Sequence, residues 1–117
     1  MKLSGSQWIA GNPSSKSSKT FRAANPATGE SLDPEFREAS KAEIDAAVSA
    51  ATAAFDSFRN KLAESRADFL ETIAEEVLAL GDPFLERTAA ETGYPLARCE
   101  AERGRAIAHT RQFADVV

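Results

Sequence analysis

From residue 40 onward, apolar residues return at steps of three and four positions, which is the spacing of one face of an α-helix. Ser40, followed three residues later by Glu43, has the form of a capping box, so the first helix is expected to begin there. The periodicity excludes a strand in this stretch and makes the chain mainly α-helical. The face of the first helix that is expected to be buried consists of Ile44, Val48, Ala51, Phe55 and Phe58.

Three further helices are predicted after the first. Ser65 is expected to cap the second helix, whose apolar stripe ends at Gly81. The pair Asp82-Pro83 starts a short third helix that closes at Gly93, and Pro95 opens a fourth. The larger apolar residues that these three helices carry are Phe69, Ile73, Val77, Leu80, Phe84, Leu85, Leu96, Cys99, Ile107 and Phe113.

The first 39 residues contain extended and turn-forming sequence instead. A short strand is expected at residues 7–10, and residues 20–23 are predicted to return beside it as a small amino-terminal β-hairpin. Trp8 is expected to anchor the first of these strands by packing. A proline and a glycine in residues 25–29 indicate a tight turn, and an extended stretch at residues 35–38 could pair with the earlier strand.

The composition excludes several classes of protein. Hydrophobic residues make up 43% of the chain, but nearly half of them are alanine, which buries little apolar area, so we expect closely packed helices that need more protein around them. The net charge is −4 and no basic stripe accompanies aromatic residues, which argues against nucleic-acid binding. Apolar runs are too short for a transmembrane helix, and the first residues do not form a secretion signal. A single cysteine is typical of a reducing cytoplasm.

The residue types that carry chemistry do not form a catalytic group. Cys99 and His109 are ten residues apart, so on one helix they lie about 15 Å apart along the axis and point in directions about 80° apart. They therefore form no dyad, and one cysteine with one histidine is too few for a metal cluster. We expect a half-buried structural cysteine and a histidine on the surface or the flank of a helix.

The remaining charged and glycine residues also have structural explanations. The carboxylate pairs at 75–76 and at 100 and 102 point apart on a helix and cannot act jointly. Helix salt bridges are expected instead in three pairs: Glu100 with Arg103, Arg98 with Glu102, and Arg111 with Asp115. The glycines are too scattered to form a dinucleotide-binding loop, and Gly104 inside the fourth helix indicates close helix contact there.

Four groups of motifs follow one another in a distinctive order: Phe21–Glu30; Glu43–Val48 followed by Ala50–Phe55; Arg66–Leu70 with Ile73-Ala74; and Glu91–Pro95 followed by Glu102–Arg105. The first contains the turn Asn-Pro-Ala-Thr-Gly-Glu and the last opens with Glu-Thr-Gly-Tyr-Pro. In this order and spacing they resemble the amino-terminal segment of the aldehyde dehydrogenase superfamily, over almost the whole chain.

Within that superfamily, four segments look most like the α-ketoglutaric semialdehyde (2,5-dioxovalerate) dehydrogenase branch: Leu32–Phe36, Arg66–Leu70, Ala79–Asp82 and Glu100–Arg105. The resemblance implies the fold of a truncated amino-terminal part of an aldehyde dehydrogenase-like α/β protein. Residues 1–39 would be an extended or β-hairpin arm, and residues 40–117 a four-helix segment of an incomplete cofactor-binding domain.

The resemblance also implies an oxidoreductase that converts an aldehyde to a carboxylic acid with NAD or NADP. In the family a cysteine thiolate forms a thiohemiacetal, hydride passes to the nicotinamide, and a glutamate-activated water releases the acid. Those residues and the dinucleotide loop lie downstream of this region, and Cys99 does not match the catalytic motif. Some relatives hold a monovalent cation near here, for which the backbone carbonyls of Ala24 and Asn25 and the carboxylate of Glu91 are the matching positions.

Three interpretations remain open. In the leading one, the chain is a truncated aldehyde dehydrogenase, because the fourth helix runs to Val117 without a cap, proline or polar loop. The isolated chain would then bind no NAD(P) and have no activity. Its partner would be the remainder of the enzyme chain, and the full-length enzyme would be a homo-oligomer. The uncovered apolar faces of the isolated chain would make it poorly stable or self-associating. The alternatives are a stand-alone small helical interaction module without enzymatic activity, and a fragment that reassembles with a separately made remainder.

Overall fold

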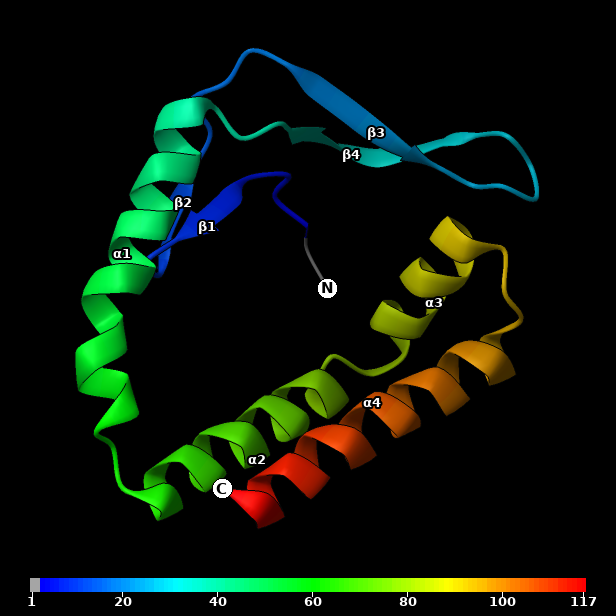
Figure 1. The fold of residues 1–117 in the computed structure, drawn as a ribbon. Coiled ribbons are helices and arrows are strands. Elements are labelled where there is room, and N and C mark those ends of the chain that lie inside the picture. Colours follow the sequence, from blue (N-terminus) through cyan, green and yellow to red (C-terminus); the bar gives the residue numbers. More distant parts are fainter. Residues whose placement is uncertain (1–2) are drawn as a thin grey trace. The chain divides into compact units, whose positions relative to one another are not determined.

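The computed structural model describes residues 3–117, and these form four β-strands followed by four α-helices (Figure 1). The described residues group into two compact units. One contains the residues up to Ala24 together with Glu30–Asn60, and the other contains Asn25–Gly29 together with Lys61–Val117. We call them the hairpin unit and the helix unit.

The hairpin unit contains two antiparallel hairpins in place of the single one predicted. Strand β1 (Gln7–Ile9) pairs with β2 (Asn12–Ser14), with Trp8 opposite Pro13. Both residues of the connecting turn have positive φ, 49° at Ala10 and 78° at Gly11, as a two-residue hairpin turn requires. The prediction that residues 20–23 return beside the first strand was wrong, because this tight turn supplies a nearer partner.

The second hairpin joins β3 (Thr20–Ala24) to β4 (Ser31–Arg37). The predicted pairing of the extended stretch near residue 35 with the earlier strand is confirmed. The rings of Phe21 and Phe36 stack with centroids 5.7 Å apart, and Arg22 forms an ion pair with Asp33 across the strands. Cross-strand pairs of this kind fix the register of an isolated two-stranded ribbon.

Helix α1 (Lys41–Arg59) begins as predicted. The Ser40 side chain accepts a hydrogen bond from the Glu43 amide, and the Glu43 side chain accepts one from the Ser40 amide, so the capping box is confirmed. The buried face was predicted wrongly for these residues, because the β1–β2 hairpin covers only part of the helix. The large apolar residues of that face, Ile44, Val48, Phe55 and Phe58, are 45–61% exposed.

The helix unit contains α2 (Ala63–Ala79), α3 (Gly81–Thr92) and α4 (Leu96–Val116). The predicted caps at Ser65 and Asp82 were wrong, because α2 begins after Leu62 and α3 directly after Leu80, which places both polar residues inside the first turns. The predicted end at Gly93 is confirmed by its φ of 71°, and Pro95 precedes α4 as expected.

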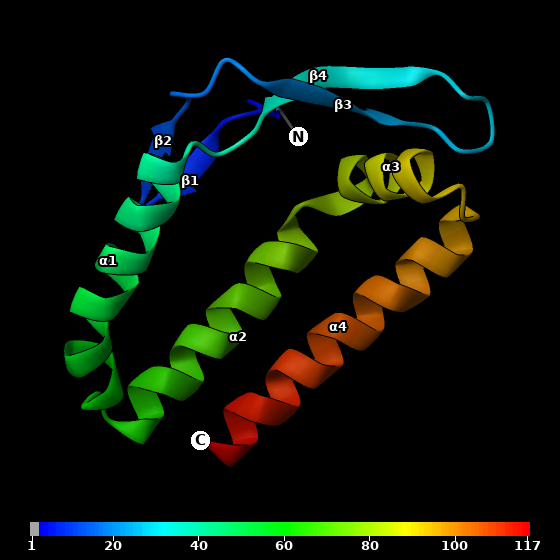
Figure 2. The same cartoon turned by 45° about the horizontal axis from the view of Figure 1, so that its top comes forward.

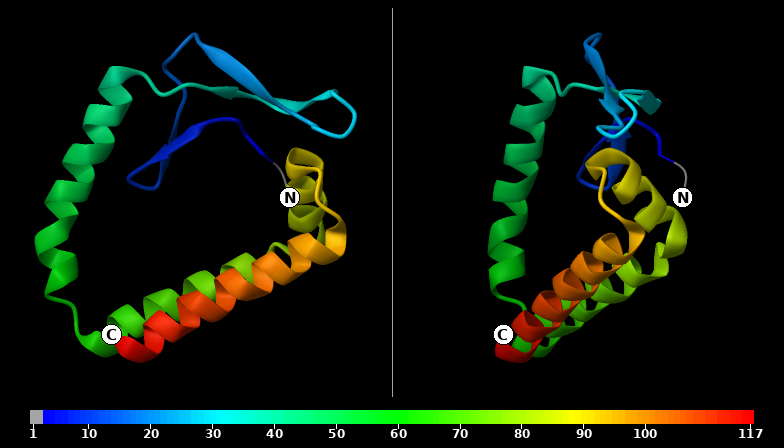
Figure 3. Two further views of the ribbon diagram at one scale, coloured as in Figure 1. Left: turned by 45° about the vertical axis from the view of Figure 1, so that its right-hand side comes forward. Right: turned by 90° about the vertical axis from the view of Figure 1, so that its right-hand side faces the viewer.

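Helices α2 and α4 run side by side in opposite directions (Figures 2 and 3), and α3 packs on α4. Between α2 and α4, Arg111 Nε lies 3.1 Å from Glu71 Oε2, in place of the predicted partner Asp115. The predicted pair of Arg98 with Glu102 is confirmed. The buried apolar residues of this unit are Ala74, Leu85, Cys99, Ile107 and Ala114.

The fold class is therefore confirmed as mainly α-helical with small amino-terminal β-hairpins. The prediction of close helix contact at Gly104 was wrong, because a Cβ placed there meets nothing within 4 Å.

Large apolar residues of the helix unit, like those of α1, are exposed to solvent. Those with 37–62% of their surface exposed include Phe69, Ile73, Leu78, Leu80, Leu96 and Phe113.

Candidate functional site

The helix unit brings together the two turns that stood out in the sequence. In the first, the Gly29 amide donates to the Asn25 carbonyl at 2.7 Å and the Ala27 amide donates to Asn25 Oδ1 at 2.9 Å. In the second, Gly93 ends α3 in the left-handed region. A Cβ on Gly93 would lie 3.2 Å from Pro26 Cγ, so the two turns approach each other closely at a position where a φ of 71° favours glycine.

The positions that the sequence suggested for a cation lie on and near these turns. Asn25 belongs to the first turn, and Glu91 lies two residues before Gly93. Ala24 is the last residue of β3, where it pairs with Ser31. The Asn25 carbonyl accepts one hydrogen bond and keeps a second lone pair for another partner.

The carboxylate at this place already has a cationic partner. Glu91 Oε1 accepts a hydrogen bond from Arg87 Nε at 2.5 Å, and the Arg87 side chain is only 18% exposed. A metal ion at Glu91 would therefore compete with a largely buried guanidinium. Within residues 3–117, no group of three or more His, Cys, Asp or Glu side chains is arranged to hold a metal ion.

The structure separates the one thiol from the one imidazole. Cys99 is 3% exposed, more deeply buried than the half-buried cysteine expected, and its sulfur lies 4.0 Å from the Tyr94 carbonyl oxygen. His109 is exposed further along α4, as predicted. Cys99 therefore contributes to the core of the helix unit, and the described residues bring no base to its sulfur.

The neighbouring acidic residues on α2 and α4 do not form carboxylate pairs that could act together. Glu75 and Glu76 are both exposed on α2. Glu102 accepts from Arg98 Nε at 2.8 Å and lies 2.7 Å from Arg105 Nη2. The hydrogen bond from Arg98, with the charges of both arginines, lowers the pKa of Glu102 below its usual range. A carboxylate held ionised by two arginines is suited to an ion-pair network and not to proton transfer at neutral pH.

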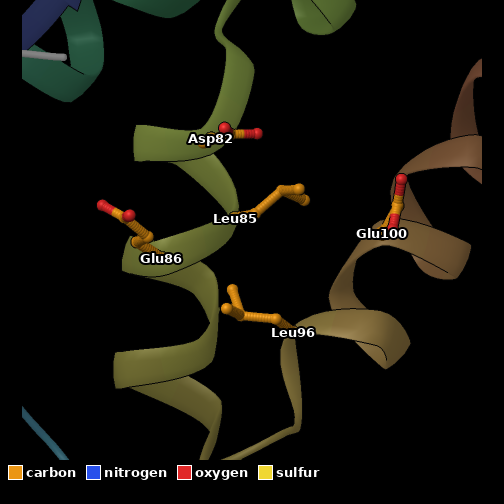
Figure 4. A pocket seen from close by; sticks show the side chains of 5 residues that line it. All are labelled: Asp82, Leu85, Glu86, Leu96 and Glu100. Carbon is orange, nitrogen blue, oxygen red and sulfur yellow. The ribbon is translucent and has the colours of Figure 1, made fainter.

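A cavity of about 290 Å³ lies between α3 and α4, lined by Asp82, Leu85, Glu86, Leu96 and Glu100. In the close view, Leu85 and Leu96 point toward the gap between the two helices, whereas Glu86 points away from it (Figure 4). The lining residues supply neither a nucleophile nor a hydrogen-bonded acid–base pair. We therefore assign no chemistry to this cavity.

The hairpin unit contains a polar centre that the sequence revealed only in part. Glu43 Oε1 accepts from Ser14 Oγ at 2.5 Å and from the Lys16 amide at 3.1 Å, while Oε2 accepts from Ser40 at both its amide and its hydroxyl. These bonds, led by the one from Ser14, lower the pKa of Glu43 to about 2. The capping box predicted the Ser40 contacts, but no local spacing indicates the partners 27 and 29 residues earlier.

None of the helices among the described residues has the length and apolarity needed to cross a membrane.

Comparison with known proteins identifies the family. The profile described as "Aldehyde dehydrogenase family" matches residues 13–117. The chain is 44% identical over its whole length to alpha-ketoglutaric semialdehyde dehydrogenase 2 of Azospirillum brasilense. It spans 22% of the length of that relative.

Solved structures agree with the sequence match. A succinate-semialdehyde dehydrogenase of Burkholderia pseudomallei superimposes with a TM-score of 0.87 at 33% identity, over 97% of this chain and 23% of its own. A betaine aldehyde dehydrogenase of Staphylococcus aureus, solved with NAD⁺, gives a TM-score of 0.89 at 24% identity, over 98% of this chain and 24% of its own. The chain thus has the fold of the corresponding quarter of those enzymes, and it belongs to the aldehyde dehydrogenase family.

Proposed function

We propose that this chain is part of an NAD(P)-dependent aldehyde dehydrogenase that oxidises an aldehyde to a carboxylic acid, with 2,5-dioxovalerate as substrate and 2-oxoglutarate as product. The observation that carries the proposal is the 44% identity, over the whole chain, to alpha-ketoglutaric semialdehyde dehydrogenase 2 of Azospirillum brasilense. The relatives also include a succinate-semialdehyde dehydrogenase at 33% identity. Both names describe short aldehydes that carry a carboxylate at the other end.

Within such an enzyme, we assign the chain a structural role. Residues 1–39 would form an arm, and residues 40–117 would be a helical part of the cofactor-binding domain. The exposed apolar residues of α1, α2 and α4 support this assignment, since a protein surface with many large apolar side chains is usually covered by further protein. The NAD(P) would be held elsewhere in the enzyme, because the glycines of this chain form no phosphate-binding loop.

Taken alone, the chain is then expected to be inactive, and its location in the cell is proposed to be the cytoplasm. The inactivity follows from the chemistry of its residues: the thiol of Cys99 is buried and the one histidine is exposed on the same helix. Turnover of 2,5-dioxovalerate by residues 1–117 that survives Cys99→Ser would contradict this.

A chimera tests the assignment to the enzyme. The segment of the Azospirillum brasilense dehydrogenase that matches this chain is replaced by residues 1–117, and NAD(P)⁺ reduction is measured with 2,5-dioxovalerate and with succinate semialdehyde. We expect a folded, active enzyme that prefers the first substrate. A matched chimera carrying Gly93→Val should lose activity, because a branched side chain would press on Pro26 at a residue whose φ of 71° is strained for valine. An inactive chimera that is folded and binds NAD⁺ would contradict the proposal.

The carbonyls of Ala24 and Asn25 with the carboxylate of Glu91 are proposed as a monovalent-cation site of the same enzyme. The turn geometry at Asn25 supports it, whereas the ion pair of Glu91 with Arg87 opposes it. Thermal unfolding of the chimera in potassium, sodium and tetramethylammonium chloride at equal ionic strength provides the test. Equal midpoints in all three salts would exclude the site.

A further inference from the structure

The β1–β2 hairpin is attached to the rest of the hairpin unit at two places. At its base, the Arg37 amide donates to the Gly5 carbonyl at 3.0 Å, and the Gln7 side chain donates to the Arg37 carbonyl at 2.5 Å. The Glu38 amide donates to the Lys19 carbonyl at 2.9 Å. These bonds hold the two ends of the segment, before β1 and after β2, on the end of β4.

The second attachment lies at the end of β2, and there Glu43 of α1 is the partner. Its carboxylate accepts from Ser14 Oγ and from the Lys16 amide, and its side chain is almost completely buried, with the residue 2% exposed. In the described part of the chain, Glu43 is the one fully buried side chain larger than alanine. The hairpin is therefore joined to α1 by a buried charge.

Apolar packing between the hairpin and α1 is incomplete. Trp8 is 69% exposed, so the packing anchor expected from the sequence is loose. Two shallow pockets that open to solvent, with volumes of about 220 Å³ and 390 Å³, lie along this contact. Both are lined by Trp8, Ile9 and Ala47, and the larger also by the small side chains of Ala50, Ala51 and Ala54. Side chains this far from close packing contribute little of the dispersion energy that holds a core together.

We propose that the β1–β2 hairpin is a hinged strap, fixed at its base to the end of β4 and fastened to helix α1 by the carboxylate of Glu43. Removing the charge of that carboxylate releases the strap while α1 and the helix unit stay folded. An amide replaces the carboxylate poorly, because each carboxylate oxygen accepts from one backbone amide, that of Lys16 or that of Ser40, and an NH₂ group in either place would face that donor. A neutral acid is a weaker acceptor for all four hydrogen bonds.

The surrounding charges do not offer an alternative partner. Lys41 and Asp45, the charged neighbours of Glu43 on α1, pair with each other at 2.7 Å. Lys16 contributes its backbone amide, and Arg37 donates its guanidinium to the Ser17 carbonyl at 2.9 Å. The hydrogen bonds from Ser14, Ser40 and Lys16 account for the lowering of the Glu43 pKa to about 2, against the opposing effect of burial.

The linkage between charge and attachment sets the direction of the pH dependence. The pKa of Glu43 is lowered in the fastened state from its usual 4.5 to about 2. Because this pKa is lowered, the contribution of Glu43 to the stability of the fastened state is fully present above pH 4.5 and is lost as the pH falls from there toward 2. The strap is thus fastened at neutral pH and opens in acid.

Amide hydrogen exchange of residues 3–117 at neutral pH tests the proposal, with Glu43→Gln compared with Asp45→Asn. The second variant removes the same charge two positions away, from an exposed ion pair. We expect exchange of residues 7–18 to rise by about tenfold or more in Glu43→Gln only, while the amides of α2 and α4 keep their protection. Equal exchange of residues 7–18 in both variants would overturn the proposal, as would a loss of protection throughout the chain in Glu43→Gln alone.

Ser14→Ala keeps the carboxylate and removes one donor, so it tests the proposal even if Glu43→Gln does not fold. The amide protons of Lys16 and Ser40 report the ionisation of Glu43 in an NMR titration, and Trp8, the one tryptophan, reports the strap by fluorescence. We expect both probes to change together in acid and to change at a higher pH in Ser14→Ala. A Trp8 transition that does not follow the Lys16 amide would overturn the proposal.

Discussion

The two compact units bury opposite kinds of side chain. In the helix unit, the buried residues are Ala74, Leu85, Cys99, Ile107 and Ala114, and all are apolar. In the hairpin unit, the buried side chain larger than alanine is the carboxylate of Glu43. The helix unit is therefore held mainly by non-directional apolar packing, and the hairpin unit by a few directional hydrogen bonds.

This difference indicates which substitutions each unit is expected to tolerate. The four hydrogen bonds of the Glu43 side chain share one carboxylate, so loss of one donor is expected to affect the others. Apolar packing spreads over many atoms, and its loss scales with the volume removed. The large apolar residues of α1 are exposed and are not among the buried residues of either unit, and in the proposed enzyme they would face further protein.

The largest effect is expected from the apolar core. Ile107→Ala removes a buried side chain of α4 and should lower the free energy of unfolding by about 2–4 kcal/mol. Val48→Ala on the exposed face of α1 is the matched control and should change it by less than about 1 kcal/mol. Urea unfolding followed by circular dichroism measures both. A Val48→Ala effect as large as that of Ile107→Ala would mean that α1 is covered in solution and would break the comparison.

The next effect concerns the contact of the two turns within the helix unit. Gly93→Ala places a Cβ 3.2 Å from Pro26 Cγ at a residue with φ of 71°, and should destabilise this unit by about 1–3 kcal/mol. Gly104→Ala is the control with the opposite expected sign. Gly104 lies in α4, a Cβ there meets nothing within 4 Å, and alanine should stabilise the helix by about 0.5–1 kcal/mol. A Gly93→Ala variant that is as stable as the parent, or more stable, would contradict both the left-handed conformation of Gly93 and its close approach to Pro26.

Sequence reasoning succeeded where structure depends on local signals. The capping box at Ser40, the helix end at Gly93 and the helical period of α1 each involve residues within a few positions of one another. It failed at Ser65 and Asp82, because a polar residue near a helix start is a cap only if the helix begins directly after it.

Burial was the second kind of failure, and it has a different cause. Periodicity identifies the face of α1 that is apolar, but the residues that cover a face can lie far away in sequence, where local spacing does not indicate them. The Ser14 and Lys16 partners of Glu43 were missed for the same reason, since 27 to 29 residues separate them. The cation positions at Ala24, Asn25 and Glu91 came from the resemblance, and the Arg87 partner of Glu91 was not anticipated.

A third effect, of moderate size, belongs to the hairpin unit. Ser40→Ala removes the side-chain acceptor of the Glu43 amide and one donor to the Glu43 carboxylate, and it should destabilise α1 by about 1 kcal/mol. Ser65→Ala is the control, since Ser65 lies inside α2 and caps no helix. Amide hydrogen exchange in the first turn of α1 should be faster in Ser40→Ala than in Ser65→Ala. No difference between the variants would show that the capping box does not form in solution.

The smallest effect is expected for the ion pair that joins α2 to α4. Arg111 and Glu71 are roughly half exposed, and such pairs contribute about 0.2–1 kcal/mol, so a double-mutant cycle with Arg111→Gln and Glu71→Gln should give a coupling in that range. The coupling should fall as sodium chloride rises toward 1 M, because salt screens exposed charges. The pair of Arg98 with Glu102, within α4, is the control for an ion pair that does not depend on helix packing. A coupling between Arg111 and Glu71 that vanishes even at low salt, while that of Arg98 with Glu102 persists, would mean that this ion pair does not hold α2 to α4 in solution. The two helices would then depend on the buried apolar residues of the helix unit alone.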